Sequence, residues 1–225
     1  MGSFNLESFL IAAPVLLFSI VAHEWAHGWA AYHQGDTSVR VTWDPRPYID
    51  PVGSILVPAL TLIIGSTPFG WARSWPFDKA KFRNFKRGDI IVSLAGVTMN
   101  FLLAVASTLL IIATGLIGRA LPGLTPSVSI LQAMLEMGIR LNLILAVLNL
   151  LPLPPFDGSH VMKYLLPPAW ALAYMRIGAY GFLIFFALIT VARPVLQVWM
   201  LPAGVLYGIA RGVADPFMLA GPWTS

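Results

Sequence analysis

Long apolar segments separated by short polar connections make up most of the chain. Five of them are candidate transmembrane helices: residues 8–33, 90–118, 128–151, 170–191 and 194–210. The second of these contains no charged side chain. At a rise of about 1.5 Å per residue, a helix of that length exceeds the roughly 30 Å hydrocarbon core of a bilayer. The pattern therefore predicts an all-α polytopic membrane protein.

A sixth apolar segment, residues 51–66, is a weaker candidate for a crossing. It is short, Pro58 interrupts it, and it contains Gly53 and Gly65. Non-helical backbone is tolerated at membrane depth where protein buries it or where it lines a cavity. This segment therefore fits a re-entrant or β-like membrane-associated element at least as well as a helix. The sequence predicts about five to six transmembrane helices, with this element between the first span and the 90–118 span.

The composition narrows the class of protein further. Hydrophobic residues make up 57% of the chain and charged residues 11%, whereas a soluble domain carries about 25% charged residues. A water-soluble core and a disordered chain are both excluded. The chain has no cysteine, which excludes disulfides and thiolate metal sites. The net charge of +4 comes from residues that flank apolar segments, which is typical of membrane orientation and not of nucleic-acid binding.

The first apolar segment contains the motif His23-Glu24-Trp25-Ala26-His27. On a helix, residues four positions apart project from nearly the same face, so two imidazoles at this spacing can bind one zinc ion. The intervening glutamate can then accept a proton from an attacking water. Polar side chains are costly inside an apolar span, which favours a metal site over two histidines that only pack between helices.

A catalytic zinc ion takes three protein ligands and keeps one position open, so the motif needs a third ligand. Asp157 is the strongest candidate. It follows a proline-rich turn at the end of the 128–151 span and precedes Gly158, which permits a tight turn toward the bundle. His160 is the rival ligand, three residues later. The remaining candidates are Glu7, His33, Glu136 and the acids of the polar loops.

The geometry of one metal ion constrains the topology. The ion can contact the two motif histidines and Asp157 only if the first span and the 128–151 span end on the same side of the membrane. Because the 90–118 span crosses once and the 128–151 span crosses back, residues 51–66 must then not cross.

The charge distribution indicates the same topology. Residues 67–89 contain six Lys and Arg residues, and the positive-inside rule places such a cluster in the cytoplasm. Binding of anionic lipid head groups is an alternative role for it. Lys163 and Arg211 would lie on the same side, and Arg119 and Arg193 on the outer side. The predicted metal site then faces the cytoplasm.

Three motifs together resemble the site-2 protease family of intramembrane zinc metalloproteases. They are His23-Glu24-Trp25-Ala26-His27, then Ala95-Gly96-Val97-Thr98-Met99-Asn100, then the segment from Asn149 to Gly158. The chain is most similar to the compact prokaryotic branch that lacks PDZ and CBS domains. The resemblance implies one metalloprotease domain over residues 1–225, with a catalytic core at about 8–165 and further C-terminal helices at about 168–212.

The resemblance also implies one zinc ion per chain and a role for each matching residue. The implied roles are zinc binding for His23, His27 and Asp157, general base catalysis for Glu24, and substrate binding for Asn100 and Asn149.

The activity that the resemblance implies is hydrolysis of peptide bonds within or near transmembrane segments of membrane proteins. The implied partners are a transmembrane-helix protein substrate and the lipid bilayer, without nucleic acid, in the cell membrane of a prokaryote. A helical substrate must partly unwind before cleavage. Residues 51–75 are the candidate strand-like partner for its backbone, and a membrane-surface loop with only a packing role is the alternative for this stretch. Two other interpretations remain open: a catalytically silent relative that binds membrane helices, and a metal transporter.

Overall fold

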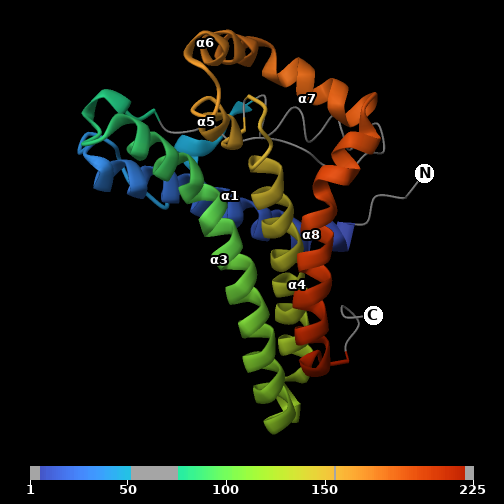
Figure 1. The fold of residues 1–225 in the computed structure, drawn as a ribbon. Helices are drawn as coiled ribbons and strands as arrows, with labels where there is room; N and C mark the ends of the chain where they lie inside the picture. Colours follow the sequence, from blue (N-terminus) through green and yellow to red (C-terminus); the bar gives the residue numbers. More distant parts are fainter. Residues whose placement is uncertain (1–5, 52–75, 155, 221–225) are drawn as a thin grey trace.

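A computed structural model describes residues 6–51, 76–154 and 156–220, and every regular element within them is helical (Figure 1). The predicted all-α class is therefore confirmed for the described residues. The α-helices are α1 (Leu6–Gln34), α3 (Phe85–Ala120), α4 (Thr125–Asn149), α5 (Gly158–Met162), α6 (Pro168–Ile177), α7 (Gly181–Thr190) and α8 (Arg193–Ala214). Short 3-10 helices are η1 (Arg46–Tyr48), η3 (Lys79–Lys81), η4 (Pro122–Leu124), η5 (Gly178–Tyr180) and η6 (Asp215–Phe217).

Three segments of the described chain are helical, long and apolar enough to cross a membrane: Leu10–Gln34, Phe85–Ala120 and Pro122–Asn149. They coincide with the first three long apolar segments of the sequence. The element predicted at residues 51–66 and the strand-like stretch at 51–75 lie outside the described residues from position 52 onward.

Helices α3, α4 and α8 run side by side, and α1 crosses α3 and α4 (Figure 1). Small side chains allow the close approach, because the core between the three long helices includes Ala104 of α3 and Ala203 of α8. Trp199 of α8 donates a hydrogen bond from Nε1 to the carbonyl oxygen of Val147 in α4, at 2.9 Å. The remaining buried members of this core are Ile111, Ile139, Leu143, Val147 and Ala214.

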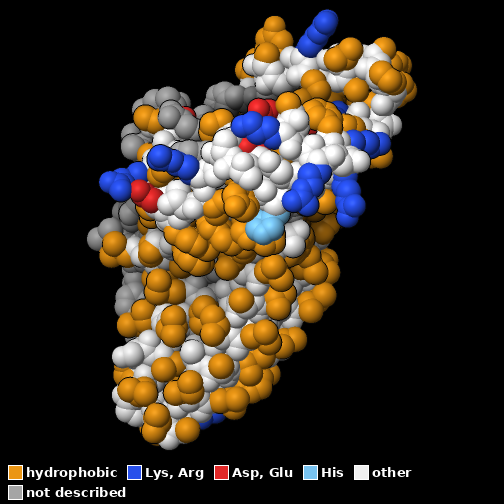
Figure 2. All heavy atoms as spheres, turned by 90° about the vertical axis from the view of Figure 1, so that its left-hand side faces the viewer, with side chains coloured by type: hydrophobic (Ala, Val, Ile, Leu, Met, Phe, Trp, Pro, Cys, Tyr) orange, Lys and Arg blue, Asp and Glu red, His pale blue; other side chains and the backbone are white. Residues whose placement is uncertain are grey.

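Apolar and basic side chains separate along the long axis of the molecule. In Figure 2 the apolar side chains cover the long lower part, and Lys and Arg gather around the end where α5 and α6 lie. On α3, Leu102 and Leu109 are 58% and 60% exposed. Soluble proteins rarely expose apolar patches of this extent, so the long lower surface is suited to contact with lipid.

The C-terminal region differs from the prediction. Residues 170–191 do not form one long helix, because α6 and α7, of ten residues each, are joined by the 3-10 turn η5. Gly178 and Gly181 flank that joint, and glycine destabilises a helix interior through its backbone freedom. Both helices lie across the end of the bundle instead of along it (Figure 1).

Helix α8 consequently begins at the end of the bundle where α4 ends and runs back along α4. At the far end, Arg119 of α3 donates a hydrogen bond to the carbonyl oxygen of Pro216. Arg211 therefore lies near Arg119, and Arg193 lies at the opposite end. The predicted sides of Arg211 and Arg193 were wrong, because residues 170–191 do not cross the bundle lengthwise.

Candidate metal centre

The side chains of His23, His27 and Asp157 converge at one point. Their potential ligand atoms all lie within 4.8 Å of one another. The two Nε2 atoms are 3.0 Å apart. Oδ2 of Asp157 lies 3.2 Å from Nε2 of His23 and 3.4 Å from Nε2 of His27. Both histidines are buried.

Two separate elements bring these side chains together. The spacing of four residues puts both histidines on one face of α1. Asp157 comes from the turn after α4, and this turn packs tightly at Gly158. A Cβ on Gly158 would lie 2.6 Å from the carbonyl oxygen of Leu151, so only glycine fits there. The compact turn carries the Asp157 carboxylate back to α1.

Hydrogen bonds fix the orientation of both imidazoles. Nδ1 of His23 donates to Oδ1 of Asn100 at 2.5 Å, and Nδ1 of His27 donates to the carbonyl oxygen of Val92 at 2.7 Å. Because a carbonyl oxygen can only accept, each Nδ1 carries the proton of the neutral ring. Both Nε2 atoms then direct lone pairs toward the point of convergence. Carbonyl acceptors commonly orient metal-binding histidines in this way.

The converging atoms fit a cation. Two Nε2 lone pairs and a carboxylate oxygen meet without a proton to share between them, and Oδ2 of Asp157 has no hydrogen-bond partner among the described residues. Two imidazole nitrogens and one carboxylate are a known ligand set of catalytic zinc.

Glu24 lies next to His23 on α1 and is also buried. Burial raises the pKa of the Tyr48 phenol, and the negative charge of Glu24 adds to that increase. Glu24 thus belongs to the same buried part of α1 as the converging histidines.

The two asparagines predicted to bind substrate differ in their contacts. Asn100 uses its Oδ1 on His23 and its Nδ2 on Asn142. Asn149 donates from Nδ2 to the carbonyl oxygen of Leu145, one turn earlier in α4, at 3.0 Å. The geometry thus gives Asn100 the position of a histidine-orienting residue, and Asn149 lies at the end of α4, before the Asp157 turn.

The other candidate ligands are held elsewhere. Nδ1 of His160 lies 3.2 Å from Nζ of Lys79, and burial together with this lysine lowers the pKa of the His160 imidazole. Glu136 accepts a hydrogen bond from the Tyr207 hydroxyl at 2.8 Å and pairs with Arg211. His33 is exposed and bonds through Nδ1 to the carbonyl oxygen of Trp29 at 2.8 Å. The structure does not bring any of the three to the converging ligands.

Sequence reasoning assigned no role to Asp89, whose side chain is fully buried in the first turns of α3. Its carboxylate pairs with Lys79 at 2.7 Å and with Lys163, and it accepts a hydrogen bond from the Tyr164 hydroxyl at 2.8 Å. Burial and the charge of Asp89 raise the pKa of that phenol. The cluster ties α3 to the segment directly after α5. An acid just inside an apolar helix is the signal that could have identified it.

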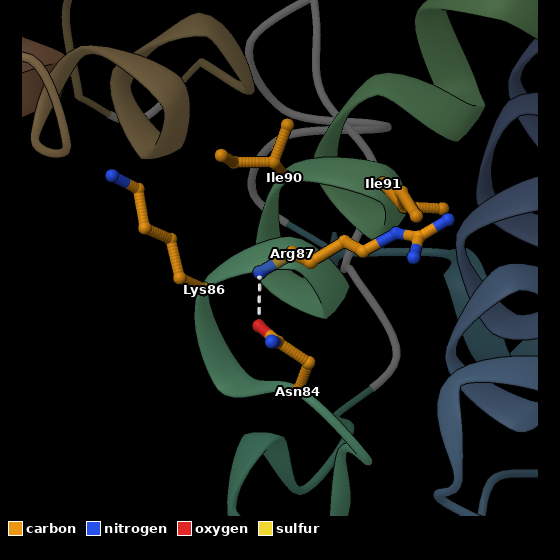
Figure 3. A pocket seen from close by; sticks show the side chains of 5 residues that line it. All are labelled: Asn84, Lys86, Arg87, Ile90 and Ile91. Carbon is orange, nitrogen blue, oxygen red and sulfur yellow. Dashed lines mark hydrogen bonds between the residues drawn. The ribbon is translucent and has the colours of Figure 1, made fainter.

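A separate pocket of about 310 Å³ lies at the start of α3 (Figure 3). Asn84 caps the helix by accepting a hydrogen bond from the backbone N–H of Arg87 at 2.9 Å. In Figure 3 the Lys86 and Arg87 side chains extend to opposite sides of this turn. None of the three converging ligands lines the pocket, whose walls are Asn84, Lys86, Arg87, Ile90 and Ile91.

Known proteins give an independent view of the chain. The sequence pattern of "Peptidase family M50" matches residues 11–192. The chain is 34% identical over 194 residues to "Putative zinc metalloprotease YwhC" of Bacillus subtilis (strain 168), covering 84% of each protein. It is 31% identical over 223 residues to "Putative zinc metalloprotease Rip2" of Mycobacterium tuberculosis, covering 95% of this chain and 78% of that relative. No solved structure shows a significant match.

The matched region contains all three motifs and the three converging side chains. The chain therefore belongs to peptidase family M50, the site-2 protease family, and both the resemblance seen in its motifs and the prediction of a peptidase are confirmed.

Proposed function

We propose that this protein is an intramembrane zinc metalloprotease that hydrolyses peptide bonds within or near transmembrane segments of membrane proteins. The observation that carries the proposal is the convergence of His23, His27 and Asp157, with both Nδ1 protons already donated to carbonyl oxygens. Two of these ligands belong to a helix long and apolar enough to cross a membrane. The names of the relatives from Bacillus and Mycobacterium support zinc as the metal.

In this proposal His23, His27 and Asp157 hold the zinc ion. Zinc bound there would supply a Lewis acid that polarises the scissile carbonyl and lowers the pKa of water at the site. Glu24 accepts the proton of the attacking water and delivers it to the leaving amine. Its burial in α1 strengthens its electrostatic interactions, because the local dielectric is low. Asn149, at the end of α4, contacts the substrate.

We place the active site toward the cytoplasmic side of the cell membrane. The basic side chains that gather at the α5 end of the molecule support this orientation. Three described segments are candidate crossings, and α8, with 22 residues, is the proposed fourth. The packing of α8 along α4 supports one domain over residues 1–225, with a core at about 8–165 and C-terminal helices at about 168–212.

Zinc content tests the metal site. The full chain is purified in detergent, and zinc per chain is measured in the wild type and in the variants Asp157→Ala and His160→Ala. We expect about one zinc ion in the wild type, marked loss in Asp157→Ala, and retention in His160→Ala, because His160 contacts Lys79 and not the motif histidines. Loss of zinc in His160→Ala but not in Asp157→Ala would make His160, and not Asp157, the third ligand.

Cleavage tests the chemistry. Wild type and Glu24→Gln are incubated with single-pass transmembrane peptides that carry helix-weakening Gly or Pro residues, and products are mapped by mass spectrometry. We expect the wild type to cut within or near the apolar segment, and Glu24→Gln to bind zinc and cut nothing. Wild-type turnover by Glu24→Gln would refute the mechanism. Zinc binding without any cleavage by the wild type would favour the catalytically silent relative, and zinc passage into vesicles would favour the transporter.

A further inference from the structure

A buried chain of hydrogen bonds connects His23 to α4. Asn100 lies between them, since its Oδ1 accepts from His23 and its Nδ2 donates to Oδ1 of Asn142 at 2.9 Å. Nδ2 of Asn142 donates to Ser19 Oγ and to the carbonyl oxygen of Gly138, each at 2.9 Å. Asn100, Asn142 and Ser19 are at most 2% exposed. Bulk water therefore does not compete for these hydrogen bonds.

The carbonyl oxygen of Gly138, at the far end of this series of hydrogen bonds, fixes which atom donates in each of them. The carbonyl oxygen of Gly138 can only accept, so the nitrogen of the Asn142 amide must face it. Ser19 donates its own proton to the carbonyl oxygen of Val15 at 2.8 Å, so its oxygen also accepts from Asn142. The Oδ1 atom of Asn142 is left to face Asn100 and holds the nitrogen of that amide.

The orientation of the Asn100 amide decides which nitrogen of His23 carries the proton. With Oδ1 toward the ring, Nδ1 is the protonated atom and Nε2 is free to bind a metal. A rotated Asn100 would present its NH₂ group to Nδ1 and favour the proton on Nε2. That is the atom that faces His27 and Asp157, and a protonated nitrogen cannot be a ligand.

We infer that Asn142 is a positioning residue of the metal site, which acts through Asn100 to set the tautomer of His23. The inference rests on the proposed metal site but adds a residue outside its three motifs. His27 needs no such relay, because a backbone oxygen, that of Val92, accepts its Nδ1 proton directly.

The test substitution is Asn142→Leu, which removes the polar groups and keeps a similar volume. Zinc affinity is measured on the full chain in detergent by competition with a chromophoric chelator. We expect the zinc dissociation constant to rise by about tenfold, at the low end of the 10–100-fold loss that removal of a ligand-orienting partner causes. The absorption spectrum of the Co²⁺-loaded variant should change as well, because the His23 ring is less well oriented.

The tautomer is measured directly by ¹⁵N NMR of histidine-labelled, metal-free protein at alkaline pH, where both rings are neutral. We expect the wild type to carry the His23 proton on Nδ1, and Asn142→Leu to show a substantial Nε2-protonated population. His27 is the internal reference and should keep its proton on Nδ1. Asn142→Asp should restore the wild-type tautomer, because a carboxyl oxygen still accepts from Nδ2 of Asn100.

Gln132→Leu is the matched control. Gln132 lies on the same helix, is fully buried, and donates to the carbonyl oxygens of Ile111 and Phe217 at 3.2 and 3.0 Å. Its loss also removes buried hydrogen bonds, but none that leads to His23. We expect lower thermal stability in this variant with unchanged zinc affinity and tautomer. If Asn142→Leu does not fold, Ser19→Ala removes one of the two acceptors of the Asn142 nitrogen and should shift the tautomer in the same direction by a smaller amount, because the Gly138 carbonyl still holds that nitrogen.

Two results would overturn the inference: wild-type affinity and tautomer in Asn142→Leu, or an equal effect in Gln132→Leu. A wild type that binds no zinc would overturn the proposed function instead. The NMR comparison needs no metal, so it still decides whether Asn142 controls the His23 ring.

Discussion

Gly96 of α3 faces His27 of α1 so closely that a Cβ on Gly96 would lie 2.5 Å from the His27 Nε2 atom. The same Cβ would lie 2.6 Å from Nε2 of His23. Carbon atoms do not approach ring nitrogens to such distances, so any side chain at position 96 would displace the imidazoles. The glycine keeps α3 against the metal site while leaving the ligand atoms in place.

Gly96→Ala should therefore remove metal binding. Overpacking of a tight site costs about 1–3 kcal/mol, and the displaced rings would no longer meet Asp157. We expect zinc content to fall well below one ion per chain and proteolysis to be lost. Gly208→Ala on α8 is the control, because nothing lies within 4 Å of a Cβ there. Full zinc content in Gly96→Ala would show that the two helices can separate without cost.

Asp89→Asn should destabilise the α5 end of the molecule. The substitution leaves Lys79 and Lys163, both largely buried, without their anion. Breaking a buried ion pair by removing one partner costs about 3–5 kcal/mol, and the partial exposure of both lysines reduces this to about 2–3 kcal/mol. A lower unfolding temperature should follow. Zinc binding should weaken as well, since the cluster ties α3 to the segment after α5, and α5 directly follows Asp157 in the chain.

The matched variant is Asp44→Asn, which removes an exposed ion pair with Arg46. Exposed pairs contribute little, so this protein should unfold as the wild type does. Equal unfolding temperatures for Asp89→Asn and the wild type would mean that the buried cluster adds no net stability.

The sequence was sufficient to predict that His23, His27 and Asp157 converge, because local rules determine where each of them lies. The spacing of His23 and His27 puts both on one helix face, and the prolines and Gly158 around Asp157 predict a turn at the end of a span. Helices α1, α3 and α4 follow from apolar length. Asn142 and Val92, the partners that orient the histidines, come near them only through the packing of one helix on another. Spacing along the sequence does not predict that packing.

The error at residues 170–191 has a physical origin of a different kind. Apolar length alone predicts one crossing there, but Gly178 and Gly181 lower the cost of ending a helix at that point. Hydropathy depends on the polarity of the side chains and contains no information about the conformational freedom of the backbone at glycine. The direction of α8, and with it the side of Arg211, depends on that single break.

Asp36 should make stability depend on acidic pH. Its buried carboxylate accepts hydrogen bonds from the backbone N–H groups of Asp78 at 2.6 Å and Ser38 at 3.0 Å, and Nζ of Lys81 lies 3.5 Å away. Burial would raise the pKa of Asp36, but the hydrogen bonds and the lysine lower it overall. An acid with a lowered folded-state pKa stabilises fully above its unfolded value of about 3.9, and loses this contribution as the pH falls below it.

The wild type should therefore show a falling unfolding temperature as the pH is lowered from about 5 to about 3. Asp36→Asn cannot titrate, so it should be less stable at neutral pH and should lose part of that slope. Thermal unfolding across this pH range measures both effects. Identical slopes in the two proteins would assign the acid sensitivity to other carboxylates.

Removal of the metal should weaken the whole fold, because the proposed zinc site joins α1 to the turn after α4. At a free zinc concentration about 100 times the dissociation constant, one bound ion stabilises the folded state by about 2.7 kcal/mol. A chelator should therefore lower the unfolding temperature of the wild type, and added zinc should restore it. Asp157→Ala should unfold at the same temperature with and without chelator, since it lacks the third ligand. A chelator effect of wild-type size in Asp157→Ala would place the stabilising metal at some other site.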